Sequence, residues 1–321
     1  MKPKVLVVGS SNTDMVVKTE RVPDPGETLL GGDFMMISGG KGANQAVAAA
    51  RLGAEVTLVA RVGRDVFGER MAANLTAAGV NTRYIVRDDG APSGIALVFV
   101  APTGQNAILV APGANHRLTA GNVDAAADAF ERCDVVVLQL EIPDEAVLAT
   151  IDRAHRLDKP VILNPAPARH LPASAMQKVA VLTPNENETL FYLKEIGESG
   201  LEAKVGSHEI TPSEAQRLLA LGVKSAVVTC GRRGAIVVSD DRAHAIPGHR
   251  VTVEDTTAAG DCFTGALTCA LAEGKELGPA AHFANFVAAL SVTKLGAQTS
   301  LPIRAEVDEF IHRRSGIGSG Q

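Results

Sequence analysis

One carboxylate stands among small residues at the start of a predicted helix. In the run DTTAAGDCFTGA, Ala258, Ala259 and Gly260 carry little or no side chain. They lead through Asp261 into an apolar-periodic helix that should continue to about Ala272. Small residues let an anion approach the backbone N–H groups at the positive end of the helix dipole. An aspartate beside that anion could take the proton of an attacking hydroxyl, so the run favours phosphoryl transfer. Taken alone, it fits an ordinary helix start at least as well.

A glycine-rich segment, SGGKGANQA at residues 38–46, combines backbone donors with polar side chains. Its glycines let backbone N–H groups approach a ligand, and Lys41 and Asn44 could bind sugar hydroxyls. It is not a Walker A loop, because Gly42 follows the Gly-Lys pair where that motif has Ser or Thr. A plain hinge remains an alternative explanation.

Other polar residues follow apolar runs that look like buried strands. Asn12 and Asp14 follow KVLVVGSS, and Glu141 follows DVVVLQL. Open α/β sheets bind ligands beyond the carboxyl ends of their strands, and an Asn/Asp pair suits vicinal hydroxyls. The alternatives are Asx-turn chemistry for the pair and a surface carboxylate for Glu141.

Two more segments could serve a nucleotide. Asn185 and Glu188 share one face of a helix that follows VAVLTP, where they could organise phosphate oxygens and the waters of Mg²⁺. An N-terminal cap is the alternative. The run TCGRRG, residues 229–234, could lay its backbone along a nucleotide or form a tight turn between strands.

These segments require a scaffold that gathers strand ends. Short apolar runs alternate with helical-period stretches, which predicts an α/β fold: a doubly wound, mostly parallel central sheet with helices on both faces. Residues 14–38 and 93–111 break this rhythm, the second as a hairpin around Thr103-Gly104-Gln105. They predict a small β-sheet, either a lid or an edge of the main sheet. The expected helices span residues 41–52, 66–78, 119–131, 144–157 and 211–222.

Length and composition indicate a single α/β domain over residues 1–321, with 197–209 and the tail 315–321 loosely structured. The net charge of −5 and scattered basic residues argue against nucleic-acid partners. The four cysteines lack disulfide or zinc spacing, and no apolar run reaches about 18 residues. We therefore expect a cytoplasmic protein without a membrane partner.

The segments together resemble the ribokinase-like (PfkB) carbohydrate kinase family over Val5 to about Phe310. The matching pieces, in order, include GSSNTD, PGET, GGKGANQAVAAARLGA, QLE, NPAPA, TPNENE, DTTAAGDCFTGAL and KLGAQTSLP. The resemblance implies ATP-dependent sugar phosphorylation. The GGKGAN, NPAPA and GAQTS pieces point within the family to D-ribose, phosphorylated at its 5-hydroxyl with Asp261 as the catalytic base.

The resemblance also implies ligand sets, residue by residue. Sugar contacts would come from Asn12, Asp14, Gly39, Gly40, Lys41, Gly42, Ala43, Asn44, Glu141 and Asp261. ATP and an anion hole would be lined by Asn185, Glu188, Thr229, Cys230, Gly231, Arg232, Arg233, Gly234, Ala258, Ala259, Gly260 and Asn285, with Mg²⁺ near Asn185 and Glu188. A K⁺ ion would lie among Asp255, Thr257, Ser291, Lys294, Gly296 and Ser300. The family lid further implies a homodimer.

Some departures and rival functions remain open. Cys262 stands where the family often has Thr or Ser, and at a helix start it could be an oxidation-sensitive thiol or simply a small residue. Ser38 replaces a frequent aromatic, and residues 193–210 are longer than usual. The rivals are a related kinase for deoxyribose, fructose or adenosine, and a non-catalytic sugar-binding protein. A dinucleotide-dependent dehydrogenase is disfavoured, because GSSNTD is not G-x-G-x-x-G.

Overall fold

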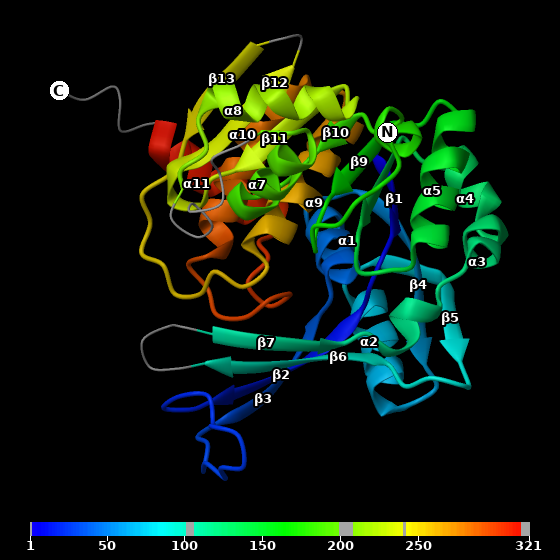
Figure 1. Ribbon diagram of the computed structural model, residues 1–321, viewed down its shortest axis with the longest axis vertical. Coiled ribbons are helices and arrows are strands. Elements are labelled where there is room, and N and C mark those ends of the chain that lie inside the picture. Colours follow the sequence, from blue (N-terminus) through cyan, green and yellow to red (C-terminus); the bar gives the residue numbers. More distant parts are fainter. Residues whose placement is uncertain (1, 101–105, 199–207, 240–241, 316–321) are drawn as a thin grey trace.

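The computed structural model describes residues 2–100, 106–198, 208–239 and 242–315. In these residues the chain forms a nine-stranded sheet flanked by helices and a separate four-stranded sheet (Figure 1). The expected hairpin turn Thr103-Gly104-Gln105, most of segment 197–209 and the tail beyond Ser315 lie outside the described residues. No helix in the described ranges is long and apolar enough to cross a membrane.

The large sheet has the order β13-β12-β11-β10-β9-β8-β1-β4-β5. Neighbouring strands are parallel from β11 to β5, and only the β11–β12 and β12–β13 pairs are antiparallel. The predicted mostly parallel sheet is therefore confirmed. The pattern missed β5 and β13, the two edge strands, and implied β12 only through the alternative of a turn between strands at residues 229–234, which is present. The strands are β1 Lys4–Val8, β4 Glu55–Gly63, β5 Val80–Asp88, β8 Val135–Gln139, β9 Val161–Asn164, β10 Val181–Leu182, β11 Ser225–Thr229, β12 Gly234–Ser239 and β13 Arg242–Pro247.

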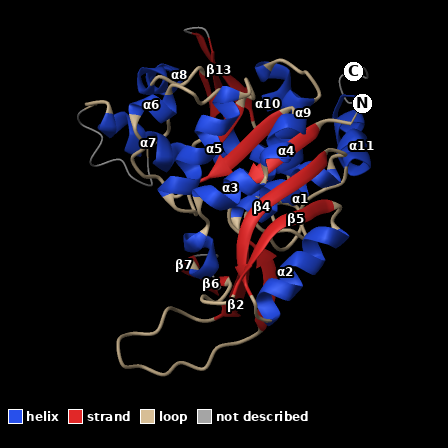
Figure 2. Cartoon of the chain, turned by 90° about the vertical axis from the view of Figure 1, so that its right-hand side faces the viewer, coloured by secondary structure: helices blue, strands red, loops and turns tan. Residues whose placement is uncertain are grey.

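Helices cover both faces of this sheet (Figure 2). Alternate residues of one strand point to opposite faces, and accordingly Leu6 and Val8 of β1 join one hydrophobic core while Val5 and Val7 join the other. The helices are α1 Lys41–Arg51, α2 Val66–Ala77, α3 Ala120–Ala125, α4 Ala127–Arg132, α5 Asp144–Arg156, α6 Ala173–Met176, α7 Glu186–Glu195, α8 Pro212–Gln216, α9 Ala259–Ala272, α10 Leu277–Ser291 and α11 Arg304–Ser315.

Two predicted helices are not continuous. The expected helix at 119–131 is interrupted at Ala126 between α3 and α4, where φ and ψ are −94° and 20°. The expected helix at 211–222 becomes α8 followed by a 3₁₀ turn, Arg217–Leu221, that ends at Gly222 in the left-handed region. Neither interruption involves a residue that the sequence analysis assigned to a ligand site.

The four-stranded sheet has the order β3-β2-β6-β7 and projects from the main body (Figure 1). Its strands are β2 Asn12–Lys18, β3 Phe34–Gly39, β6 Gly94–Val100 and β7 Asn106–Ala111. Both segments that broke the βα rhythm thus supply one small sheet. Asn12 pairs with Gly39 of β3 and Gly94 of β6, so the base of this sheet lies where β1 leaves the main sheet.

Helices α1 and α9 pack closely because small residues face each other. A Cβ built on Gly265 would lie 2.7 Å from Ala48 Cβ and 2.7 Å from the carbonyl oxygen of Gln45. Any larger residue at this position would push the helices apart. The close crossing brings the start of α1, with its glycine-rich segment, next to Asp261 in the first turn of α9.

Candidate active site

Two adjoining pockets lie between the carboxyl ends of the strands and the start of α9. The larger has a volume of about 1080 Å³ and the smaller about 200 Å³. They share Asn185, Thr229, Thr256, Ala259 and Gly260 as lining residues. A ligand that occupies both would therefore pass over the first residues of α9.

Asp261 lies in the small pocket and is 7% exposed. Its Oδ2 accepts a hydrogen bond from Asn44 Nδ2 at 2.9 Å, and its Oδ1 accepts one from Gln45 Nε2 at 3.1 Å. A Cβ built on the adjacent Gly260 would meet nothing within 4 Å, so this backbone faces open space. The carboxylate and the dipole end of α9 are thus presented to one ligand.

Lys41 lies among carboxylates at the start of α1. Burial opposes its charge, but Asp261, Glu141 and Glu188 outweigh that effect and raise the pKa of its ammonium. Burial also raises the pKa of Asp14 to about 7, with Glu141 and Asp261 adding to the effect and Lys41 opposing it. A polyhydroxyl ligand finds both donors and acceptors here, and Lys41 partly balances the acids.

The glycines before α1 are required by close approach. A Cβ built on Gly39 would lie 2.2 Å from Asp14 Oδ2, and Gly40 has φ of +88° with its hypothetical Cβ 2.6 Å from the Asn12 nitrogen. Gly42 and Ala43 instead direct their amides to Ser10, at 3.4 Å to its Oγ and 2.8 Å to its carbonyl oxygen. These two residues therefore serve packing more than ligand contact.

Asn12 is held by a residue to which the sequence pattern assigned no role. Asn115 Nδ2 donates to Asn12 Oδ1 at 2.7 Å, and Asn115 Oδ1 accepts from the Ser11 backbone at 2.9 Å. Gly94 leaves the space for this contact, since its Cβ would lie 2.3 Å from both side chains. One lone pair of the Asn12 oxygen is thus used, and the contact orients the amide nitrogen, which can donate to a ligand. Asn115 ends the run GAN at residues 113–115, which carries no periodic signal that would assign it this contact.

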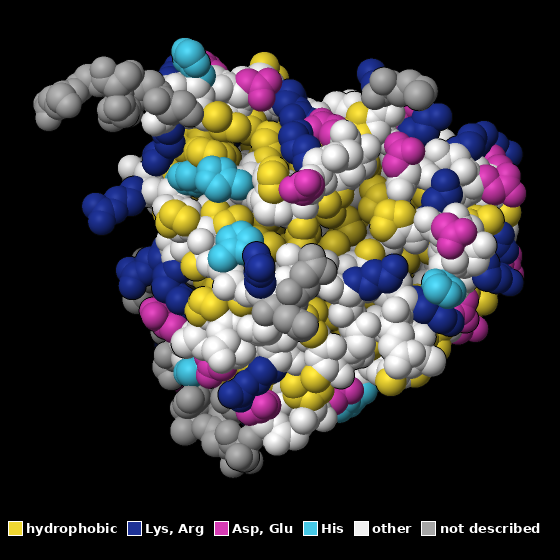
Figure 3. Space-filling model, turned by 90° about the horizontal axis from the view of Figure 1, so that it is seen from above, with side chains coloured by type: hydrophobic (Ala, Val, Ile, Leu, Met, Phe, Trp, Pro, Cys, Tyr) yellow, Lys and Arg dark blue, Asp and Glu magenta, His cyan; other side chains and the backbone are white. Residues whose placement is uncertain are grey.

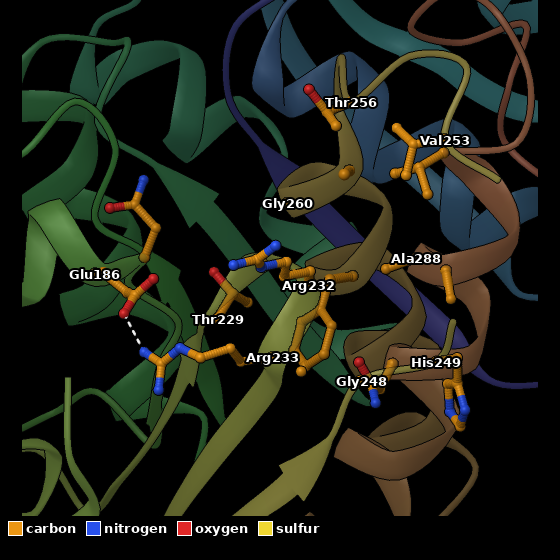
Figure 4. Close-up of a pocket in the computed structure, with 18 of the residues that line it drawn as sticks. Glu186, Thr229, Arg232, Arg233, Gly248, His249, Val253, Thr256, Gly260 and Ala288 are labelled. Atoms are coloured by element: carbon orange, nitrogen blue, oxygen red, sulfur yellow. Dashed lines mark hydrogen bonds and ion pairs between the residues drawn. The ribbon is translucent and has the colours of Figure 1, made fainter. Parts of the chain in front are cut away.

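The larger pocket contains most of the expected nucleotide residues (Figure 4). Thr229, the Gly231–Gly234 turn and Asn285 line it, whereas Cys230 is buried and donates toward the Val228 carbonyl. Asn285 Nδ2 binds the Pro247 carbonyl at 2.9 Å, and Arg233 pairs with Glu186. The segment 248–253 and Ala288 were missed, because an irregular loop and one helical alanine carry no periodic signal.

Asn185 and Glu188 form a reciprocal capping box at the start of α7. Asn185 Oδ1 accepts from the Glu188 backbone at 2.9 Å, and Glu188 Oε2 accepts from the Asn185 backbone at 2.7 Å. The cap expected as an alternative is present, and Glu188 still lines the small pocket beside Lys41 and Asp261. Among the described residues, no group of three or more His, Cys, Asp or Glu could hold a metal ion.

The residues expected around K⁺ lie in two neighbouring loops and the end of α10. Asp255 Oδ1 accepts from the Thr257 backbone at 2.8 Å, and its Oδ2 accepts from the Gly296 backbone at 2.9 Å. The hydroxyls of Ser291 and Ser300 bind the carbonyls of Ala288 and Ala297. Lys294 pairs with Glu306 at 2.6 Å, so its side chain has a partner outside the group.

Cys262 does not have the lowered pKa that its position at a helix start suggested. Its side chain is fully buried, and burial raises the pKa of its thiol to about 12, with Asp261 adding to the shift and Ser291 opposing it. The oxidation-sensitive interpretation is therefore wrong, because the reactive thiolate is disfavoured. The residue packs as a small apolar group.

Surface charge agrees with a small-molecule site. On the face shown in Figure 3, basic and acidic side chains are interspersed, and no continuous basic patch is visible. Phosphate backbones bind to concentrated positive charge. This face therefore gives no support to nucleic-acid binding.

Comparisons with known proteins agree with this geometry. A model described as pfkB family carbohydrate kinase matches residues 2–304. Ribokinase from Bacillus subtilis (strain 168) is 41% identical over 307 residues, which cover 96% of this chain and 99% of that protein. Deoxyribokinase from Salmonella typhi is 35% identical over 308 residues, covering 96% and 98%.

Solved structures give the same result. Ribokinase from Thermotoga maritima superposes with a TM-score of 0.86 at 36% identity, covering 97% of this chain and 99% of that one. Ribokinase from Arabidopsis thaliana, complexed with ribose and ATP, has a TM-score of 0.84 at 30% identity, covering 97% and 99%. The ribokinase-like fold expected from the sequence is confirmed.

Replacing Asp14 by Asn should stabilise the ligand-free protein at pH 8. The folded pKa of about 7 lies above the ordinary 3.8, so protonation of Asp14 stabilises the native state as pH falls below 7. At pH 8 the wild type lacks that stabilisation and keeps an ionised carboxylate among acids. Because the side chain is partly exposed, we expect an advantage of about 1–2 kcal/mol at pH 8.

Thermal unfolding at pH 8 and pH 5 measures this difference. The Tm advantage of Asp14→Asn should shrink at pH 5, where the wild-type group is protonated in the folded state. An advantage that grows as the pH falls would contradict the raised pKa.

Proposed function

Since the chain belongs to the pfkB family of carbohydrate kinases, we propose that it transfers the γ-phosphoryl group of ATP to the 5-hydroxyl of D-ribose. The observation that carries this proposal is the position of Asp261, a held carboxylate where a small polar pocket meets a large one at the start of α9. Its ribokinase relatives at 35–41% identity support ribose as the acceptor.

The sugar would lie beside Asp261 and Lys41, which line the small pocket, and toward Asn12, Asp14 and Glu141, which lie outside its lining. Asp14, Lys41 and Glu141 offer acceptors and a donor to ring hydroxyls, and the Asn12 amide offers a further donor. Asp261 would accept the proton of the 5-hydroxyl while the hydroxyl oxygen forms a bond to the γ-phosphorus of ATP. The bond from that phosphorus to the β–γ bridging oxygen breaks, and ADP leaves with the electron pair.

The large pocket would hold the nucleotide along the 229–234 turn. Apolar Val253 and Ala288 would suit the faces of the base, and Asn285 is a polar residue that lines the same pocket. The triphosphate would then reach Gly260, where the start of α9 stabilises the charge on the transferring group. The protein would bring the two substrates together and exclude water.

A divalent cation fits this site only together with ATP. Glu188 is the carboxylate close to the phosphate path, and Asn185 orients it through the capping box. Magnesium keeps several waters and prefers oxygen ligands, so one carboxylate and the phosphates suffice. When bound, the ion would neutralise phosphate charge.

We also propose that K⁺ binds where the loop at Asp255–Thr257 meets residues 294–300. The hydrogen bond from the Gly296 amide to Asp255 joins these loops directly behind the start of α9. Oxygen ligands from backbone and carboxylate suit a monovalent cation. The ion would stiffen the loop that leads into the anion site.

The small sheet is proposed to act as a lid and as a dimer surface. Its edge strand β7 exposes Ile108, Leu109 and Val110 at 59%, 65% and 42%. Three consecutive exposed apolar residues on an unpaired edge favour burial against another chain. A second copy of this chain presents the same strand, so a symmetric pair buries both edges.

Phosphorylation of 2-deoxyribose is the second candidate. The deoxyribokinase relative, at 35% identity, is the observation that favours it. We propose that the Asn12 amide, which Asn115 orients, donates to the 2-hydroxyl of ribose, and this donor would lack a partner in 2-deoxyribose. Turnover with the two sugars decides between them.

Asp261→Asn should fold and bind ATP but lower kcat by about 10²–10⁴-fold, since it removes the proton acceptor. A coupled ADP assay measures turnover with ribose, 2-deoxyribose, fructose and adenosine, and calorimetry measures ATP binding. Asp158→Asn, at an exposed turn away from both pockets, is the matched control and should keep full activity.

Near-normal turnover of Asp261→Asn would refute the assignment of the base. No ATP consumption with any sugar would leave a non-catalytic sugar-binding protein.

Turnover should be several-fold higher in KCl than in choline chloride at equal ionic strength. The physical reason is that an ordered Asp255 loop holds the start of α9 ready for phosphate. Initial rates at saturating ribose and ATP measure the effect, with NaCl as a second comparison. Equal rates in all salts would exclude a role for K⁺ in catalysis.

Leu109→Lys should convert a dimer into monomers, because a charge on β7 cannot be buried against its symmetric copy. Sedimentation velocity at micromolar concentration distinguishes the 33.3 kDa chain from its dimer. Leu157→Lys, which changes an exposed leucine after α5, should leave the dimer intact. A monomeric wild type would overturn the proposed assembly.

A further inference from the structure

A chain of buried side-chain amides lies behind the Asp261 carboxylate. Gln45 comes from α1, Gln139 from the end of β8, and Asn164 from the end of β9. Both glutamines have no exposed surface, and Asn164 is 7% exposed. Asn164 also lines the small pocket, and the proposed phosphoryl transfer gives neither glutamine a role.

The amides are joined by short hydrogen bonds. Gln45 Nε2 donates to Asp261 Oδ1 at 3.1 Å and to Asn164 Oδ1 at 3.1 Å, which uses both of its hydrogens. Gln45 Oε1 accepts from Gln139 Nε2 at 2.6 Å. Every polar atom of the Gln45 amide is therefore engaged.

The hydrogen bond of Asn164 to the backbone determines which atom of each amide is the oxygen and which is the nitrogen. Asn164 Nδ2 donates to the backbone carbonyl of Thr183 at 2.9 Å, and a carbonyl can only accept. The Asn164 oxygen must then face Gln45, so Gln45 presents its NH₂ group and Gln139 in turn donates to Gln45 Oε1. As a result, a donor rather than an oxygen faces Asp261.

This arrangement is costly for stability. Gln139 Oε1 is buried without a hydrogen-bond partner, and a Cβ built on Gly9 would lie 2.0 Å from it. Burying amides without full compensation destabilises a protein, and apolar side chains of the same shape would pack without that cost. A network kept at such a cost is expected to serve orientation.

We propose that Gln45 is a positioning residue for the catalytic base, and that Gln139 and Asn164 fix the direction of its amide. Asp261 lies in the first turn of a helix, where its carboxylate could rotate. Gln45 holds Oδ1 while Asn44 holds Oδ2, so the carboxylate plane is set before the sugar arrives. This inference rests on the proposed role of Asp261.

Two variants test the proposal: Gln45→Met, and the double variant that combines it with Gln139→Met. Gln45→Met removes the donor to Asp261 and should lower kcat by about 10–100-fold, with KM for ribose and ATP changed less than about threefold. It also removes the partners of Gln139 Nε2 and Asn164 Oδ1, so its Tm should fall. In the double variant the two methionines pack together and Tm should recover in part, because only Asn164 Oδ1 then lacks its partner, while kcat stays as low as in Gln45→Met.

The control is Thr268→Val on α9, the helix that carries Asp261. Thr268 is equally buried and bonds only the Thr264 carbonyl, so its loss should lower Tm without changing kcat. Recovery of kcat together with Tm in the double variant would show a purely structural role and overturn the proposal. If Gln45→Met does not fold, the double variant decides alone: normal kcat overturns the proposal and low kcat supports it.

Asp261→Asn separates this inference from the proposed function. If that variant is inactive while Gln45→Met keeps wild-type kcat, only the positioning role fails. If Asp261→Asn itself is active, the assignment of the base fails first.

Discussion

The contact between Asp261 and the amides at the start of α1 is the interaction on which the site depends. An aspartate in the first turn of α9 becomes useful only when a second helix fixes its carboxylate, and both oxygens accept bonds from that helix. The helices approach closely enough because Gly265 lets α9 lie against Ala48 and the backbone of Gln45. Packing of small residues thus decides where the proposed base points.

The carboxylates around Lys41 lower the stability of the empty protein but favour ligand binding. Asp14, Glu141, Glu188 and Asp261 surround Lys41, and burial with mutual repulsion raises the pKa of Asp14 to about 7. Such an arrangement destabilises the empty protein, and it suits a ligand rich in hydroxyl groups that can donate to several carboxylates. Sites that bind polar ligands commonly carry this kind of unfavourable charge.

A polar side chain that makes a local structural hydrogen bond can also belong to the binding site. Asn185 and Glu188 cap α7 through reciprocal hydrogen bonds, and the same carboxylate lines the small pocket. Asn12 is fixed by Asn115, and this contact orients the amide that a ligand would meet. In both cases the local hydrogen bond selects one orientation of the polar group, which is what a binding site requires.

The sequence by itself determined the parallel βα architecture, the small sheet, and most residues of the small pocket, because apolar periodicity and glycine-rich turns are local signals. Its family resemblance, confirmed by the comparisons, identified the chemistry. It could not find the pocket lining at 248–253, the link from Asn115 to Asn12, or the amide chain behind Asp261. It also left open whether Cys262 is a reactive thiol or a small packing residue. These features depend on contacts between residues far apart in the chain: Gln45 and Asp261 are separated by 216 positions. Burial and partner geometry, which set the pKa of Cys262 and the direction of the Gln45 amide, are decided only when the tertiary structure brings such residues together.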